Sequence, residues 1–138
     1  EELISVKFIV SADSITAANA TNTVKAVTVV MSDGGRLLTE ADVFRADSGW
    51  QDFITDRAVA RIAREFPDYP NFPPRRDVYE TATKPHLWLI TERGLVLMFP
   101  PLSFGGSHAD GGIEVTIPWA ELRDYLNPAA PAPIRAAV

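Results

Sequence analysis

Cysteine is absent from the 138 residues, so the chain has neither a disulfide framework nor a thiolate metal site. Histidine occurs only at His86 and His108, and no predicted helix carries two metal ligands four residues apart. No apolar run approaches the roughly 18 residues that a membrane-spanning helix needs. We therefore expect no metal ion, no other cofactor and no transmembrane segment in this chain.

Basic residues are also scarce, with 13 Lys and Arg against 18 Asp and Glu and a net charge of -5. Phosphate binding requires clustered basic residues, so this charge argues against a nucleic-acid partner. The local exceptions are Arg57, Arg61 and Arg64, followed by Arg75 and Arg76. The helical spacing of the first three predicts a solvated face of a helix.

What remains has the composition of an ordinary globular domain, with 46% hydrophobic and 22% charged residues. A domain of this length buries roughly 68% of its unfolded surface, which is enough for one core. The sequence predicts the α+β class, with an antiparallel β-sheet covered by two or three helices. We expect a single domain over residues 1–127 and an extended or disordered Pro/Ala-rich tail over residues 128–138.

Five segments have the patterns of β-strands. In residues 4–10, the apolar residues Ile4, Val6, Phe8 and Val10 recur at every second position, which is typical of a half-buried strand. Further strands are predicted from β-branched and apolar runs bounded by turn residues, at positions 24–31, 87–91, 95–99 and 112–117.

Helices are predicted from capping residues and apolar spacing. Thr39 with Asp42 three residues later is close to a capping box for a short helical turn. Ser48 with Gln51 forms the same motif before a longer amphipathic helix that carries apolar residues every four positions. A third helix is expected to start at Pro118, since proline is favoured in the first turn.

The proline-rich residues 67–77 follow the long helix, and four prolines in eleven residues exclude regular secondary structure there. Their aromatic residues, Tyr69 and Phe72, leave two alternatives open. They pin the loop to the core, or they are exposed as a contact surface.

The glycine-rich loop before the last strand contains the most evident candidate site. Ser107, His108 and Asp110 lie together in it, but neighbours in one loop do not converge as a catalytic triad requires. The loop also lacks the lysine of a phosphate-binding loop. We predict no catalytic residue and no metal ligand, and instead a contact surface formed by Phe104, Ser107, His108 and Asp110.

The order of the segments GGRLLTEADVF, WLITERGLVLMF and GGIEVTIPWAELRDYL, with a helix after the first, resembles a known family. It is similar to the C-terminal domain of unknown function of RsiV-like anti-sigma factors, which is also attached to some bacterial peptidoglycan deacetylases. The resemblance covers nearly all of residues 1–127. The residues that carry it are Gly35, Leu37, Asp42, Phe44, Gly94, Phe99, Gly111, Glu114, Val115, Ile117, Pro118, Glu121 and Leu122.

This resemblance implies an extracytoplasmic setting in the bacterial cell envelope, either periplasmic or anchored to the membrane through a missing N-terminal region. It also implies a non-catalytic binding or accessory domain whose partner is a lysozyme-like protein or a peptidoglycan glycan. The family's loop before the last strand usually bears tyrosines, whereas here Phe104 and His108 are the only comparable rings.

Two alternatives to this function stay open. The first is a hydrolase or transferase that acts on envelope sugars through His108, Asp110 and Glu114, which requires these side chains to converge in a concave pocket. The second is a purely structural domain without a ligand.

Overall fold

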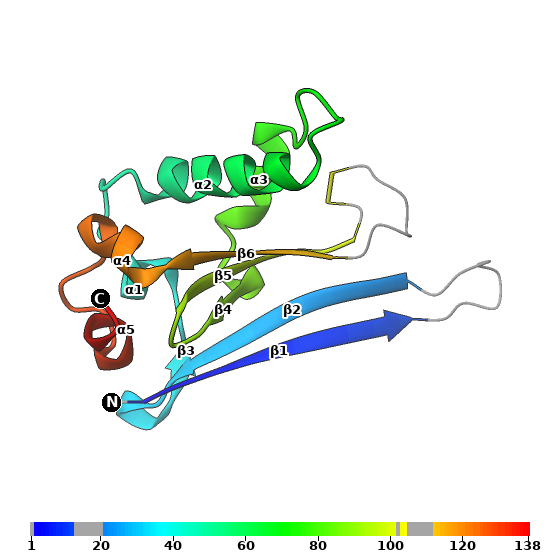
Figure 1. The fold of residues 1–138 in the computed structure, drawn as a ribbon. Helices are drawn as coiled ribbons and strands as arrows, with labels where there is room; N and C mark the ends of the chain where they lie inside the picture. The colour runs from blue at the N-terminus through cyan, green and yellow to red at the C-terminus, as the bar shows by residue number, and fades with distance from the viewer. Residues whose placement is uncertain (1, 13–20, 102, 105–111) are drawn as a thin grey trace.

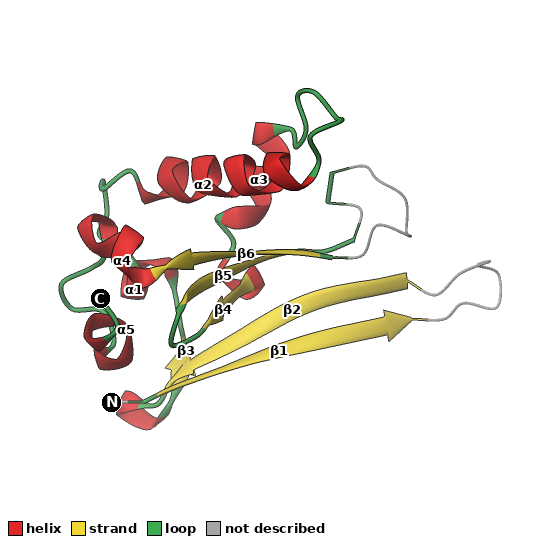
Figure 2. Ribbon diagram, viewed as in Figure 1, coloured by secondary structure: helices red, strands yellow, loops and turns green. Residues whose placement is uncertain are grey.

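The computed structural model describes residues 2–12, 21–101, 103–104 and 112–138. Two antiparallel three-stranded sheets and several helices confirm the predicted α+β class (Figure 2). The first sheet has the strand order β1-β2-β3, formed by β1 (Leu3–Ala12), β2 (Thr21–Val30) and β3 (Arg36–Leu37). The second has the order β4-β5-β6, formed by β4 (Trp88–Ile90), β5 (Gly94–Phe99) and β6 (Ile113–Pro118).

Helices connect and flank these sheets. The α-helices are α1 (Glu40–Val43), α2 (Trp50–Glu65), α3 (Arg75–Ala82), α4 (Trp119–Leu122) and α5 (Ala132–Ala136). Single 3-10 turns occur at η1 (Ser32–Gly34), η2 (Pro85–Leu87) and η3 (Arg123–Tyr125). Within the described ranges, none of these helices has the length and apolar character needed to cross a membrane.

The elements form three layers, with the second sheet in the middle (Figure 1). Helices α2 and α3 cover one face of that sheet, and the β1–β2 hairpin covers the other. The central strand β5 is buried on both sides: Leu95 and Leu97 join the core under the helices, while Val96 and Met98 pack with Ala26 of β2. This double burial explains why β5 is an unbroken apolar run.

The main core lies between the helices and the middle sheet and includes all three tryptophans. Trp50 stacks on Phe44 with ring centroids 4.5 Å apart, and Trp88 meets both rings edge-on at 5.6 Å. The Trp119 indole N–H donates a hydrogen bond to the Thr91 carbonyl at 2.8 Å. Each fully buried side chain of this size contributes about 1.5–3 kcal/mol, so these residues have a structural role in the core.

The polar side of β1, which its sequence pattern assigns to solvent, instead faces the rest of the protein. The Ser5 hydroxyl faces the second sheet and accepts a hydrogen bond from the Ile90 N–H at 3.0 Å, and Lys7 pairs with Glu114 of β6. The apolar side of the alternation faces outward and is exposed, namely Ile4, Val6, Phe8 and Val10. The predicted alternation of apolar and polar residues is therefore present in β1, but within this chain the apolar side is the exposed one.

The prediction that residues 67–77 exclude regular structure was wrong at their end, because α3 begins at Arg75 directly after two prolines. Proline is tolerated at a helix start, where its missing N–H costs nothing. The Arg75 guanidinium fixes α3 to α2 through Asp52 at 2.9 Å and Asp56 at 3.0 Å. Asp52 therefore has the structural role expected of a carboxylate near a helix start.

The prediction of an extended or disordered tail over residues 128–138 was also wrong. Residues 132–136 form α5, and Ala130 and Ile134 are buried in the main core. The Arg135 Nε donates to the Ala130 carbonyl at 2.7 Å and ties the helix to the turn before it. Proline- and alanine-rich composition does not prevent burial, because both side chains are apolar.

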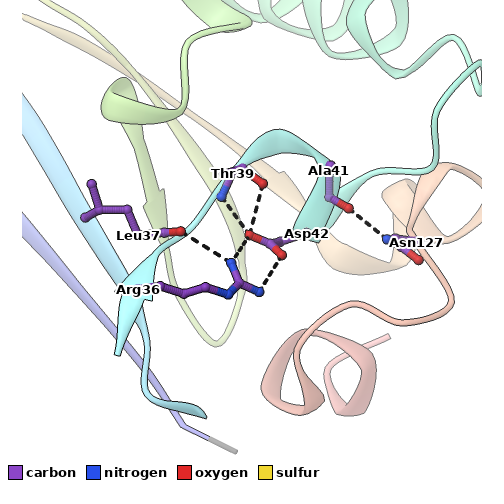
Figure 3. Close-up of polar contacts among 6 residues, drawn as sticks. All are labelled: Arg36, Leu37, Thr39, Ala41, Asp42 and Asn127. Atoms are coloured by element: carbon purple, nitrogen blue, oxygen red, sulfur yellow. Dashed lines mark hydrogen bonds and ion pairs between the residues drawn. The ribbon is translucent and has the colours of Figure 1, made fainter. Parts of the chain in front are cut away.

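One of the two predicted capping boxes is present. The Thr39 N–H donates to the Asp42 carboxylate at 2.8 Å, and the box is complete at the start of α1 (Figure 3). At α2, however, the N-cap residue is Gly49 with a φ of 78°. The buried Ser48 hydroxyl has no hydrogen-bond partner among the described residues, so the second capping-box prediction was wrong.

Candidate functional site

Only one residue of the predicted contact surface lies within the described part of the chain. Phe104 is described, whereas Ser107, His108 and Asp110 lie outside the described residues. Phe104 follows the turn after β5, in which the Ser103 N–H donates to the Pro100 carbonyl at 3.1 Å.

Phe104 is half-buried and packs against aromatic rings from two other segments. Its ring lies 5.7 Å from Phe72 in an edge-to-face arrangement and 5.4 Å from Phe99 of β5. Phe72 also meets Phe66 at 5.3 Å and Tyr69 at 6.3 Å. We call Phe66, Tyr69, Phe72 and Phe104 the aromatic cluster.

Tyr69 is the exposed ring of the aromatic cluster, with 65% of its surface accessible. The other three rings are partly buried against the main core, and two of them, Phe66 and Phe72, contact the Tyr69 ring. Both alternatives left open by the sequence therefore apply, one to each residue: Phe72 pins the loop, and Tyr69 is exposed. An accessible ring on a rigid aromatic base is a common feature of surfaces that bind sugars and proteins.

The loop that carries Tyr69 is held by its own backbone. The Tyr69 N–H donates to the Phe66 carbonyl at 3.2 Å, and the Phe72 N–H donates to the Tyr69 carbonyl at 3.3 Å. Asn71 adopts a φ of 62°, which asparagine tolerates better than most residues, and Pro73 is buried. These consecutive turns hold the backbone on both sides of Tyr69, although no regular element contains it.

A second surface feature adjoins α2, and we call it the arginine groove. It is a hollow of about 250 Å³ lined by Arg57, Ala60, Arg61, Arg64, Val115, Ile117 and Glu121. Arg57 contacts Glu121 at 3.3 Å, whereas Arg61 and Arg64 have no ion-pair partner among the described residues. The groove therefore offers two unpaired guanidinium groups beside an apolar floor.

The helical spacing of the three arginines predicts their shared exposed face, and all three are exposed. What the sequence does not indicate is that β6 lies beneath them, because that contact joins segments about fifty residues apart. Arg64 lies in the last turn of α2 and Phe66 directly follows the helix, so the groove and the aromatic cluster adjoin along the chain.

The alternative catalytic hypothesis requires His108, Asp110 and Glu114 to converge, and only Glu114 lies within the described residues. Glu114 is exposed on β6 and pairs with Lys7 of β1, while His108 and Asp110 lie outside the described residues. Among the residues that are described, no three His, Asp or Glu side chains gather as a metal site would require. His86, the one described histidine, lies at η2, where burial lowers the pKa of its imidazole and the charges of Lys84 and Lys25 lower it further.

These observations define a small α+β domain that presents an exposed aromatic ring and a basic groove. A family model described as a protein of unknown function, DUF3298, matches residues 41–120, which is more than half of the chain. The chain belongs to the DUF3298 family. No curated protein and no solved structure matches it.

Proposed function

We propose that this domain is a non-catalytic, extracytoplasmic binding or accessory module of the bacterial cell envelope. Its ligand is a lysozyme-like protein or a peptidoglycan glycan, and the aromatic cluster is its contact surface. The observation that carries the proposal is the 65% exposure of Tyr69 on a base of three partly buried rings. The likeness to RsiV-like domains, noted from the sequence, supports the setting and the class of ligand.

The aromatic cluster suits either ligand on chemical grounds. The apolar face of a sugar ring stacks on an exposed aromatic side chain, and tyrosine also supplies a hydroxyl for hydrogen bonding. At a protein interface, tyrosine is among the residues that most often carry the binding energy.

The net charge of the domain and its local arginine cluster favour different ligands. The net charge of -5 favours encounter with a basic protein, while Arg61 and Arg64 favour a ligand that carries carboxylates, as the peptide stems of peptidoglycan do. A protein bound through net charge should associate more slowly as salt is raised. A glycan should lose with salt only the part of its affinity that contacts with Arg61 and Arg64 contribute, because stacking on Tyr69 does not depend on charge.

The experiment is calorimetric titration of the purified domain with two ligands in separate arms, a c-type lysozyme and soluble peptidoglycan fragments. Saturable heat in either arm supports the proposal, and the salt dependence identifies which kind of contact is made. If neither arm gives heat at any salt concentration, the aromatic cluster does not bind the proposed envelope ligands, and the proposal is overturned.

A further inference from the structure

The outward face of the β1–β2–β3 sheet gathers most of the large hydrophobic side chains that are exposed among the described residues. Six side chains on it are between 39% and 65% exposed. They are Ile4, Val6, Phe8, Val10, Val27 and Leu37. Strand pairing places them on one side, because directly paired residues of an antiparallel ladder share a face.

This face is continuous across the three strands. Val6 pairs with Val27, and Ile4 pairs with Val29, which in turn pairs with Leu37 of β3. On the β2 strand of this side, Lys25 pairs with Phe8 near the middle of the ladder, and Thr23 pairs with Val10 nearer the far end of the hairpin. The part of the face formed by Ile4, Val6, Val27, Val29 and Leu37 contains no charged residue.

The opposite side of the same hairpin has its polar groups satisfied within the chain. The Ser5 and Thr28 hydroxyls lie 2.7 Å apart and Lys7 pairs with Glu114, so this side packs on the second sheet. Figure 1 shows the hairpin as an outer layer, with the second sheet and helices α2 and α3 on that other side. No described element remains to cover the apolar side.

We propose that a second copy of this chain covers this face, forming a two-fold dimer in which the two outer sheets pack face to face. The six side chains expose on the order of 500 Å² of apolar surface per copy, which together with the polar rim approaches the roughly 800 Å² per partner of a stable interface. Such a patch matches the upper end of what monomeric proteins expose.

The composition of the face favours a second copy over an unrelated partner. Five of its six exposed side chains are valine, isoleucine or leucine and the sixth is Phe8, as in homodimer interfaces that resemble a divided core. Surfaces that bind other proteins reversibly rely more on tyrosine, tryptophan and arginine, which are absent from this set. A face of this kind is also self-complementary under a two-fold axis, since stacked sheets pack about 10 Å apart through apolar side chains.

Sedimentation equilibrium of the full 138-residue chain tests the dimer, in the absence of any other ligand. Wild-type protein should change from monomer to dimer with a dissociation constant of about 1–100 µM, given the modest interface area. Val6→Lys places a charge at the centre of the face and should raise that constant at least about 100-fold. The matched control is Tyr79→Lys, which changes an exposed aromatic residue on α3 and should leave it unchanged.

Far-UV circular dichroism and tryptophan fluorescence show whether each variant keeps its fold, and Val27→Lys repeats the test from the neighbouring strand. A wild-type chain that stays monomeric throughout this range overturns the proposal. A dimer that survives both Val6→Lys and Val27→Lys also overturns it, because the copies would then meet elsewhere. The result is independent of the aromatic cluster, so it can fail while the proposed function stands.

Discussion

Arg36 and Asp42 form a two-pronged ion pair that joins β3 to α1. Nη1 of Arg36 donates to one carboxylate oxygen at 2.7 Å, and Nη2 donates to the other at 2.8 Å (Figure 3). The Thr39 N–H donates to the same carboxylate. The Asn127 side-chain amide donates to the Ala41 carbonyl at 2.7 Å, so this short helix is held both by the residues just before it and by a residue near the C-terminus.

This arrangement makes part of the stability depend on pH. The Arg36 hydrogen bonds, helped by those from Thr39, lower the pKa of Asp42 from its ordinary value of 3.8 to about 2. A carboxyl whose pKa is lower in the folded state stabilises the protein fully above its unfolded pKa. That contribution should therefore be complete above about pH 4 and lost as the pH falls toward 2.

We predict that Asp42→Asn lowers the free energy of unfolding at neutral pH by about 1 kcal/mol, because it removes the ion pair with Arg36. The loss is no larger because solvent screens the half-exposed Arg36. Urea unfolding of wild type and variant at a series of pH values checks this. The difference between them should shrink below pH 4. Glu40→Gln, a control in the same helical turn, should have little effect, and a constant Asp42→Asn deficit at every pH would contradict the assignment.

Gly94 is required for close backbone approach between β5 and β6. A Cβ atom at this position would lie 2.8 Å from the Ile117 carbonyl carbon and 3.0 Å from the Pro118 Cα, both backbone atoms that cannot move independently. We predict that Gly94→Ala destabilises the fold by about 2 kcal/mol or more. Thermal unfolding measures this. Gly112→Ala is the matched control, since its nearest neighbour, the Phe99 carbonyl oxygen, lies at 3.3 Å, and equal losses for both would refute the explanation.

Two residues of the aromatic cluster should differ in their effect on stability. Phe104→Ala removes contacts with Phe72 and Phe99 and should cost about 1–3 kcal/mol, since the ring is only partly buried. Tyr69→Ala should cost less than about 1 kcal/mol, because the ring is mostly exposed. Chemical denaturation of both variants compares them. A larger loss of stability for Tyr69→Ala than for Phe104→Ala would contradict this difference, because it would show that Tyr69 has a structural role.

Local patterns predicted much of the second sheet. The strands at 87–91 and 95–99 and the turn between them follow from apolar runs around Gly94, and the apolar stripe of α2 follows from its four-residue spacing. Gly94 follows Glu92 and Arg93 between the two strands, where it has the appearance of a turn residue, and a turn residue and a close-approach residue look the same in a sequence. Only the pairing of β5 with β6 distinguishes them.

Features set by distant contacts could not be predicted. The division into two sheets and the outward direction of Val6 depend on how the hairpin packs on β4, and alternation alone does not say which side another element will cover. The burial of Ile134 likewise depends on a core assembled from the whole chain. The arginine groove needs α2 above β6, a relationship absent from either segment alone.

The central claim is that the exposed ring of the aromatic cluster binds an envelope ligand. It is tested most directly by calorimetric titration of Tyr69→Ala, next to wild type and Tyr79→Ala, with the lysozyme and the peptidoglycan fragments. We expect Tyr69→Ala to weaken binding at least about tenfold while its unfolding midpoint stays near that of wild type. Tyr79→Ala, an exposed tyrosine on α3, should bind normally. Equal binding by all three proteins would contradict the claim and remove the aromatic cluster as the site.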